Sequence, residues 1–103
     1  MKKNAGYPIY AAAKAAVLGL VNGLARELGK DRIRINALVP GWVITAKQRE
    51  LWLDAEGEAA IARGQCLPGY LMADDIARAA LFLAADDSRM CSGQQFIVDG
   101  GWV

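Results

Sequence analysis

The stretch YAAAKAAVLGLVNGLARELGKDRIRINALVPG, residues 10–41, decides the fold. Its first part carries an apolar residue every three or four positions and is rich in alanine, which predicts an amphipathic helix over 10–28. The stripe consists of Val17, Leu20, Val21, Leu24 and Leu28. Gly29 is the expected C-terminal cap, and Pro8 is expected just ahead of the helix. Alternating apolar residues then predict a short strand over 33–39, closed by the Pro40-Gly41 turn.

The rest of the chain continues the alternation of helix and strand. Helical stretches are predicted over 45–62, with Gly57 dividing the stretch in two, and over 74–85, with Asp74 and Asp75 in the first turn at the positive end of the helix dipole. A second buried strand is predicted over 95–99. Such alternation favours a parallel α/β sheet, here two parallel strands with about four helices.

A chain of 103 residues has room for one small domain. Two parallel strands form a poor domain by themselves, because parallel sheets are normally several strands wide and covered on both faces. We therefore expect residues 1–103 to be a single partial domain, the back half of a larger fold. The strand over 33–39 should keep one unpaired edge.

Composition excludes several classes of function. Twelve Lys and Arg residues against 11 Asp and Glu give a formal charge of +1, which offers no basic field for nucleic acid or an anionic membrane. The absence of histidine excludes histidine-based triads and bases, and no metal site is expected. The apolar runs fall short of the roughly 20 residues that a bilayer requires. A reduced, cytoplasmic setting is expected.

Tyr10 and Lys14 are the central candidates for chemistry. Residues four apart on a helix share one face, with Cβ atoms about 5–6 Å apart. A tyrosine that acts as a base at neutral pH needs its phenolate stabilised by about 3–4 kcal/mol. An ammonium ~4 Å away contributes about 4 kcal/mol at an effective dielectric near 20, provided that the site is partly desolvated. By spacing alone, however, such a pair is more often a solvated helix surface.

Several motifs recur in one order along the chain: Tyr10-Ala-Ala-Ala-Lys14, Ile33-Arg-Ile-Asn36-Ala-Leu-Val-Pro40-Gly41 followed by Thr45, Ser92-Gly93-Gln94, and Val98-Asp99-Gly100-Gly101. Over essentially the whole chain, they resemble the C-terminal half of the short-chain dehydrogenase/reductase family. The resemblance implies a Rossmann-type, doubly wound α/β fold. It also implies NAD- or NADP-dependent interconversion of an alcohol and a carbonyl in a small-molecule substrate, and a homo-oligomer.

The same resemblance implies residue roles. Tyr10 would be the catalytic acid/base, and Lys14 would favour its ionised form and hold the nicotinamide ribose. Four residues would line the nicotinamide end of the cofactor: Pro40, Gly41, Val43 and Thr45. Asn36 fits a strand position where it would tether backbone.

A finer resemblance points to members of the family that oxidise aldoses at C1 to lactones. It is carried by Trp42, the stretch 45–49 with Lys47 and Gln48, and the stretches 56–59, 65–67 and 101–102. Polar and aromatic residues after the Pro-Gly turn would suit a sugar, so Trp42, Lys47 and Gln48 are candidate substrate residues. Alternatives are a solvated lid, a 3-oxoacyl-type carbonyl reductase, and a non-catalytic oligomerisation module.

Two parts of the family's site are not found. The phosphate-binding glycine turn follows a first strand, whereas Gly19, Gly23 and Ala25 lie within a helical pattern and fail that test of context. The catalytic serine would lie about a dozen residues before Tyr10, where the sequence has no position for it. We therefore expect residues 1–103 alone to bind NAD(P) weakly and to have little activity.

Overall fold

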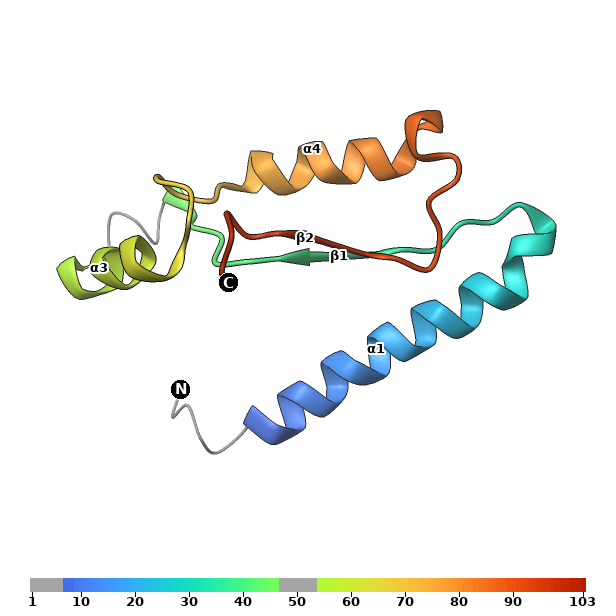
Figure 1. The fold of residues 1–103 in the computed structure, drawn as a ribbon, viewed down its shortest axis with the longest axis horizontal. Helices are drawn as coiled ribbons and strands as arrows, with labels where there is room; N and C mark the ends of the chain where they lie inside the picture. Colours follow the sequence, from blue (N-terminus) through green and yellow to red (C-terminus); the bar gives the residue numbers. More distant parts are fainter. Residues whose placement is uncertain (1–6, 47–53) are drawn as a thin grey trace. The chain divides into compact units, whose positions relative to one another are not determined.

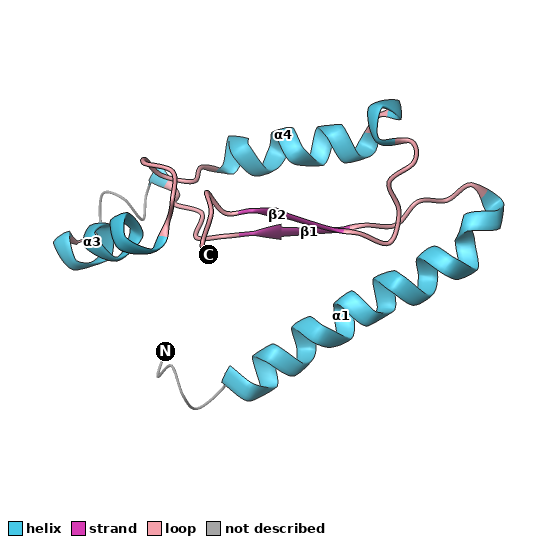
Figure 2. Ribbon diagram, viewed as in Figure 1, coloured by secondary structure: helices cyan, strands magenta, loops and turns pink. Residues whose placement is uncertain are grey.

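The computed structural model describes residues 7–46 and 54–103, and their arrangement is shown in Figures 1 and 2. The elements are helix α1 (Tyr7–Leu28), the 3-10 turn η1 (Gly29–Asp31), strand β1 (Ala37–Pro40), helices α3 (Ala55–Gly64) and α4 (Ala73–Ala84), the 3-10 turn η2 (Asp86–Ser88) and strand β2 (Gln95–Val98). The chain divides into two compact units. One comprises residues 1–37 and 89–95, and the other comprises residues 38–88 and 96–103.

Helix α1 begins three residues before the predicted start, with Pro8 inside its first turn rather than ahead of it. Proline suits this place because the first amide groups of a helix have no partner within the helix. The half-buried residues of α1 include Leu18, Val21, Leu24 and Leu28, whereas Val17 and Leu20 are exposed. The predicted stripe is therefore wrong in its first two members, which lie outside the half-buried face.

The end of α1 also differs from the prediction. The chain continues past Gly29 as η1 and reverses at Arg32, whose φ of 62° lies in the left-handed region. The Arg32 amide donates to the Gly29 carbonyl, and the Ile33 amide donates to the Leu28 carbonyl. The left-handed cap expected at Gly29 thus falls on Arg32, although this conformation is uncommon for a residue with a side chain.

The two strands pair as predicted, but β1 is shorter than expected. Hydrogen bonds from Ala37 N to Gln94 O and from Gly41 N to Val98 O advance in the same direction along both segments, which is the parallel pattern. Strand β1 covers 37–40 rather than 33–39, and β2 covers 95–98, close to the predicted 95–99. In the described residues, the sheet has these two strands only, so each keeps one edge unpaired.

Side chains and one backbone hydrogen bond, from Gly93 N to Ile35 O at 2.7 Å, join the segment before β1 to the segment before β2. The Asn36 amide donates to Cys91 O at 2.9 Å, and its Oδ1 accepts from the Gln94 amide at 3.1 Å. The Ser92 hydroxyl accepts from the Ile35 amide. The predicted tethering role of Asn36 is confirmed, but its predicted strand position is wrong, because β1 begins one residue later, at Ala37.

Helix α3 runs through Gly57 without a break, so the predicted division at this residue is wrong. The Asp54 carboxylate caps the helix by accepting from the Gly57 amide at 2.8 Å. The rest of the predicted stretch, 47–53, lies outside the described residues. Helix α4 has Asp74 and Asp75 in its first turn, as expected, and Asp75 accepts from the Met72 amide.

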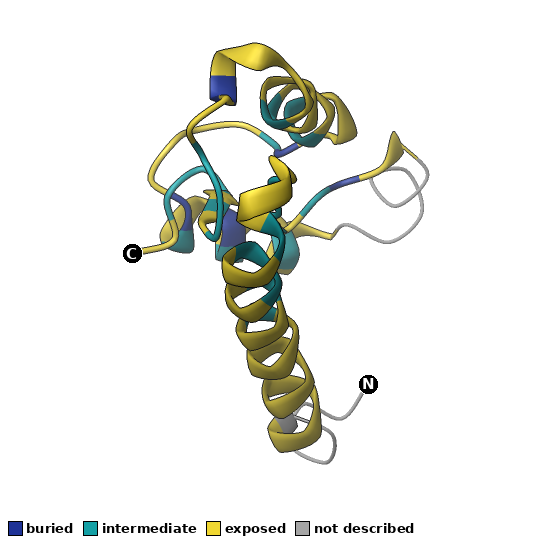
Figure 3. Cartoon of the chain, turned by 90° about the vertical axis from the view of Figure 1, so that its right-hand side faces the viewer, coloured by how far each residue is buried: buried dark blue, intermediate teal, exposed yellow. Residues whose placement is uncertain are grey.

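The buried apolar residues lie in the second unit: Ile44, Ile61 and Leu71. In the same unit, Phe82 of α4 contacts Phe96 of β2 edge to face, with ring centroids 6.4 Å apart. Figure 3 shows that α1 is mostly exposed. By length and composition alone, the stretch Pro8–Asp31 could cross a membrane, contrary to the expectation that every apolar run falls short. The core helix of a soluble protein meets the same criterion.

Candidate active site

Helix α1 brings Tyr10 and Lys14 together. The Lys14 ammonium lies 5.5 Å from the centroid of the Tyr10 ring, so the two side chains share a face of the helix as their spacing predicts. Both are exposed, Tyr10 at 57%. An exposed pair is strongly screened by water, so the full effect of the cation on the phenol requires that this face be covered.

The turn after β1 is built on a close approach of backbone. The Gly41 amide donates to Val98 O at 2.9 Å, and a Cβ at residue 41 would collide with Asp99. Glycine is therefore required here for steric reasons. Pro40 ends the strand and is exposed, and so is the indole of Trp42.

Beyond Trp42, backbone pairing with Leu71 anchors the chain. Val43 forms a parallel bridge with Leu71, and the Ile44 amide donates to Leu71 O at 2.8 Å. Ile44 is buried at 1% exposure, whereas Thr45 is exposed. The anchored Ile44 thus precedes an exposed Thr45 in the segment that follows the carboxyl end of β1, and open α/β sheets bind their ligands beyond the carboxyl ends of their strands.

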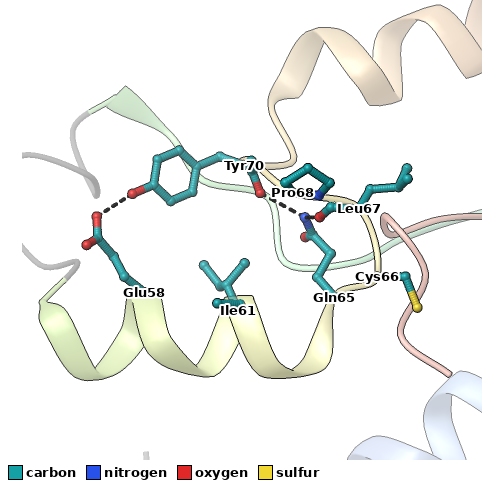
Figure 4. A pocket seen from close by; sticks show the side chains of 9 residues that line it. Glu58, Ile61, Gln65, Cys66, Leu67, Pro68 and Tyr70 are labelled. Atoms are coloured by element: carbon teal, nitrogen blue, oxygen red, sulfur yellow. Dashed lines mark hydrogen bonds between the residues drawn. The ribbon is translucent and has the colours of Figure 1, made fainter.

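A cavity of about 470 Å³ lies between α3 and the loop that follows it (Figure 4). Its lining comes from α3 and residues 65–70: Glu58, Ile61, Ala62, Gln65, Cys66, Leu67, Pro68, Gly69 and Tyr70. Figure 4 shows the Tyr70 hydroxyl directed at the Glu58 carboxylate, to which it donates a hydrogen bond. Aromatic, carboxylate and aliphatic groups therefore meet around one space.

Gln65 holds the loop of the cavity in shape. It is 8% exposed, and its side-chain amide donates to Leu67 O at 2.7 Å and to Gly69 O at 2.8 Å. One buried side chain therefore satisfies two carbonyls of a loop that has no regular structure, which fixes the path of the loop.

The C-terminal residues brace the other side of this loop. The Cys66 amide donates to Gly101 O, and the Leu67 amide donates to Gly100 O. The Trp102 ring packs so closely on Gly64 that a Cβ there would overlap the ring. Residues 64–67 are thus held by the end of the chain.

The predicted cofactor residues and the predicted base lie in different units. Tyr10 and Lys14 belong to the first, and Pro40, Gly41, Val43 and Thr45 belong to the second. Of the predicted substrate residues, Trp42 is described and exposed, and Lys47 and Gln48 lie outside the described residues. Sequence reasoning noted the stretches 56–59 and 65–67 but did not find the cavity. The local feature of the sequence that could have indicated the cavity is the Pro68-Gly69 pair after a predicted helix.

Comparisons with known proteins find similarity to dehydrogenases and reductases. A family model described as enoyl-(acyl carrier protein) reductase matches residues 1–103. A probable galactose dehydrogenase of Rhizobium meliloti is 47% identical over 94 residues, and a D-xylose 1-dehydrogenase of Caulobacter vibrioides is 46% identical over 94 residues. Each match covers 91% of this chain and 37% or 38% of the relative, so the chain spans less than two fifths of these proteins.

The fold of the chain is also similar to that of a solved dehydrogenase structure. A 4-hydroxyisoleucine dehydrogenase in complex with NADH superposes with a TM-score of 0.82 at 33% identity, covering 91% of this chain and 39% of that one. The two parallel strands and their helices are therefore part of a Rossmann-type α/β fold, as predicted.

Proposed function

Because the chain belongs to the short-chain dehydrogenase/reductase family, we propose that it supplies the proton-transfer residues of an NAD(P)-dependent oxidoreductase. The reaction interconverts an alcohol and a carbonyl. The observation that carries the proposal is the pairing of Tyr10 and Lys14 on one face of α1. A phenol beside an ammonium is a suitable acid/base for a hydroxyl proton.

Tyr10 moves the proton in this proposal. In the direction of oxidation, its phenolate oxygen takes the proton of the substrate hydroxyl while the carbon loses hydride, which leaves a carbonyl. Lys14 favours the phenolate by its charge. Bound substrate and cofactor would exclude water from this face and so strengthen the interaction of the two side chains.

The residues after β1 fit the nicotinamide end of NAD(P). Thr45 is exposed, Gly41 has no Cβ, and Pro40 and Val43 give apolar surface. Lys14 offers a cation for the hydroxyls of the adjoining ribose. When bound, NAD(P)⁺ supplies the hydride acceptor, while the chain supplies positioning and proton transfer.

An aldose oxidised at C1 to a lactone is the proposed substrate. The names of the two sugar dehydrogenases similar to this chain support it, and so does the exposed indole of Trp42, which can stack on the face of a sugar ring. Lys47 and Gln48 are proposed as hydrogen-bonding residues for the same substrate. A 3-oxoacyl ester, the other substrate class considered, is the competing outcome of the test.

The test measures NAD(P)H formation at 340 nm by the purified protein that contains this chain, with D-galactose, D-xylose and, in reverse, a 3-oxoacyl thioester. Tyr10→Phe should lower kcat by about 10²–10⁴-fold, the usual contribution of general acid/base catalysis. Tyr7→Phe, one turn earlier on α1, is the matched control and should leave kcat within about twofold. Retention of kcat in Tyr10→Phe contradicts the mechanism, and turnover of the thioester alone contradicts the aldose.

A homo-oligomer forms part of the proposal. Ile9, Leu20 and the small residues Ala13 and Ala16 recur at helical spacing on an exposed face of α1. A face of this kind is suited to close packing against a second copy of the same helix.

A further inference from the structure

We propose that the cavity between α3 and residues 65–70 binds hydroxyl groups of the substrate and selects a neutral polyhydroxylated molecule. The identification of this ligand with the aldose that is oxidised rests on the proposed function. The cavity's size, its hydrogen-bonding groups, its charge and the hydrogen bonds that hold its loop support the site independently of that function.

The size of the cavity suits a small molecule. Its volume of about 470 Å³ lies within the range of roughly 300–1,000 Å³ that is typical of ligand sites. Ile61, which is buried, and Pro68 provide apolar surface of the kind that accepts the C–H face of a sugar ring. Figure 4 shows Ile61 between Glu58 and Gln65 along α3, so apolar and polar groups alternate across the wall.

The hydrogen-bonding groups favour a ligand that donates. A carboxylate has about four acceptor positions, and the hydrogen bond from Tyr70 to Glu58 uses one of them. Hydrogen bonds to a charged acceptor are about twice as strong as those between neutral groups. Several adjacent hydroxyl groups, as on a polyol or an aldose, match a carboxylate that is held in place by a phenol.

The charge of the lining disfavours an anion. Glu58 is the charged member of the lining set, which contains neither lysine nor arginine. A phosphate or carboxylate ligand would meet like charge without a compensating cation. The cavity should therefore prefer a neutral sugar over a uronic acid or a phosphorylated carrier.

The wall opposite α3 is organised before any ligand arrives. Gln65 fixes the loop through the Leu67 and Gly69 carbonyls, and Gly100 and Gly101 hold it through two backbone hydrogen bonds. A site with this bracing does not need to order its loop on binding, so less binding free energy is lost.

The experiment compares Glu58→Gln and Tyr70→Phe with Glu56→Gln, an exposed acid on the same helix outside the lining. Steady-state kinetics give KM and kcat for D-galactose and D-xylose. Calorimetric titration of the purified protein with the same sugars gives binding without turnover. Glu58→Gln should raise KM and Kd by about tenfold or more, and Tyr70→Phe by about threefold to tenfold, with kcat within about twofold. Glu56→Gln should change neither constant.

D-galacturonate supplies the charge test, because it differs from D-galactose by a carboxylate at C6. The wild-type protein should bind it at least about tenfold more weakly than D-galactose, and Glu58→Gln should narrow that gap. The inference is overturned if Glu58→Gln and Tyr70→Phe match Glu56→Gln in both assays, or if D-galacturonate binds as well as D-galactose. Because titration requires no hydride transfer, this result is independent of the test on Tyr10.

Discussion

Helix α1 leaves Leu20 60% exposed, whereas Ile61 and Gln65, which line the cavity, are only 6% and 8% exposed. The helix is held by local hydrogen bonds and alanine-rich helix propensity. The cavity segment is held by contacts between residues far apart in sequence, such as Gly64 with Trp102 and Leu67 with Gly100. In the proposed function, proton transfer thus depends on a helix held by local interactions, and substrate binding depends on a segment held by long-range contacts.

This contrast indicates where each region is vulnerable. Tyr10 and Lys14 are in register as soon as α1 is helical, but the chemistry of the pair depends on surfaces that cover the helix. The cavity needs no such cover for its shape, but its loop depends on the last residues of the chain. A change in packing should therefore affect the cavity segment more strongly than α1.

The largest expected effect on the free energy of unfolding is that of Gly64→Ala. The added Cβ would overlap the Trp102 ring, and overpacking of this kind costs about 1–3 kcal/mol. Urea unfolding of the purified protein measures the change in stability. The double variant with Trp102→Ala is the control: once the ring is absent, the added methyl should cost nothing and should favour α3. If Gly64→Ala is as stable as the parent, the bracing by Trp102 is contradicted.

How far sequence predicted the fold depends on how local each feature is. Helix α1 could be predicted because its periodicity and propensity act over a few residues. The late start of β1 could not, because a parallel strand begins only where its partner begins, and β2 begins at Gln95. The left-handed conformation of Arg32 was not predicted, because glycine is the usual residue for a left-handed helix cap and Gly29 was therefore the better candidate. The 3-10 turn that follows α1 moves the cap to Arg32.

The residues of the site differ in the same way, by how local their contacts are. Tyr10 and Lys14 are one helical turn apart, so their proximity followed from spacing. The buried position of Gln65 depends on Gly100 and on the loop carbonyls, and no pattern near residue 65 contains that information. Gly41 was identified from the sequence as part of a Pro-Gly turn. The reason that residue 41 must be glycine is the closeness of Asp99, on the neighbouring chain segment, to the backbone at residue 41.

The second prediction tests what covers α1. If a second copy packs on the face that includes Ile9 and Leu20, Leu20→Lys should weaken association by about 2 kcal/mol or more, as expected for a residue central to an interface. Light scattering after size-exclusion chromatography should then show a shift to smaller mass. Lys30→Glu, an exposed change in η1, should leave the mass unchanged. A parent protein that is already a clean monomer contradicts the proposed oligomer.

The smallest expected effect, that of Gly19→Ala, has the opposite sign to that of Gly64→Ala. Gly19 lies within α1 about 100° around the helix from Leu20. Apart from its chain neighbours and the nearby backbone of α1 itself, no atom of the described residues lies within 4 Å of a Cβ placed there. Alanine should therefore stabilise the protein by about 0.5–1 kcal/mol through helix propensity alone. Urea unfolding of this variant and of Gly64→Ala gives the sign of each change in the free energy of unfolding. A loss of stability would mean that another segment packs closely on Gly19. The face of α1 that includes Gly19 would then be held by contacts with that segment, and not by helix propensity alone.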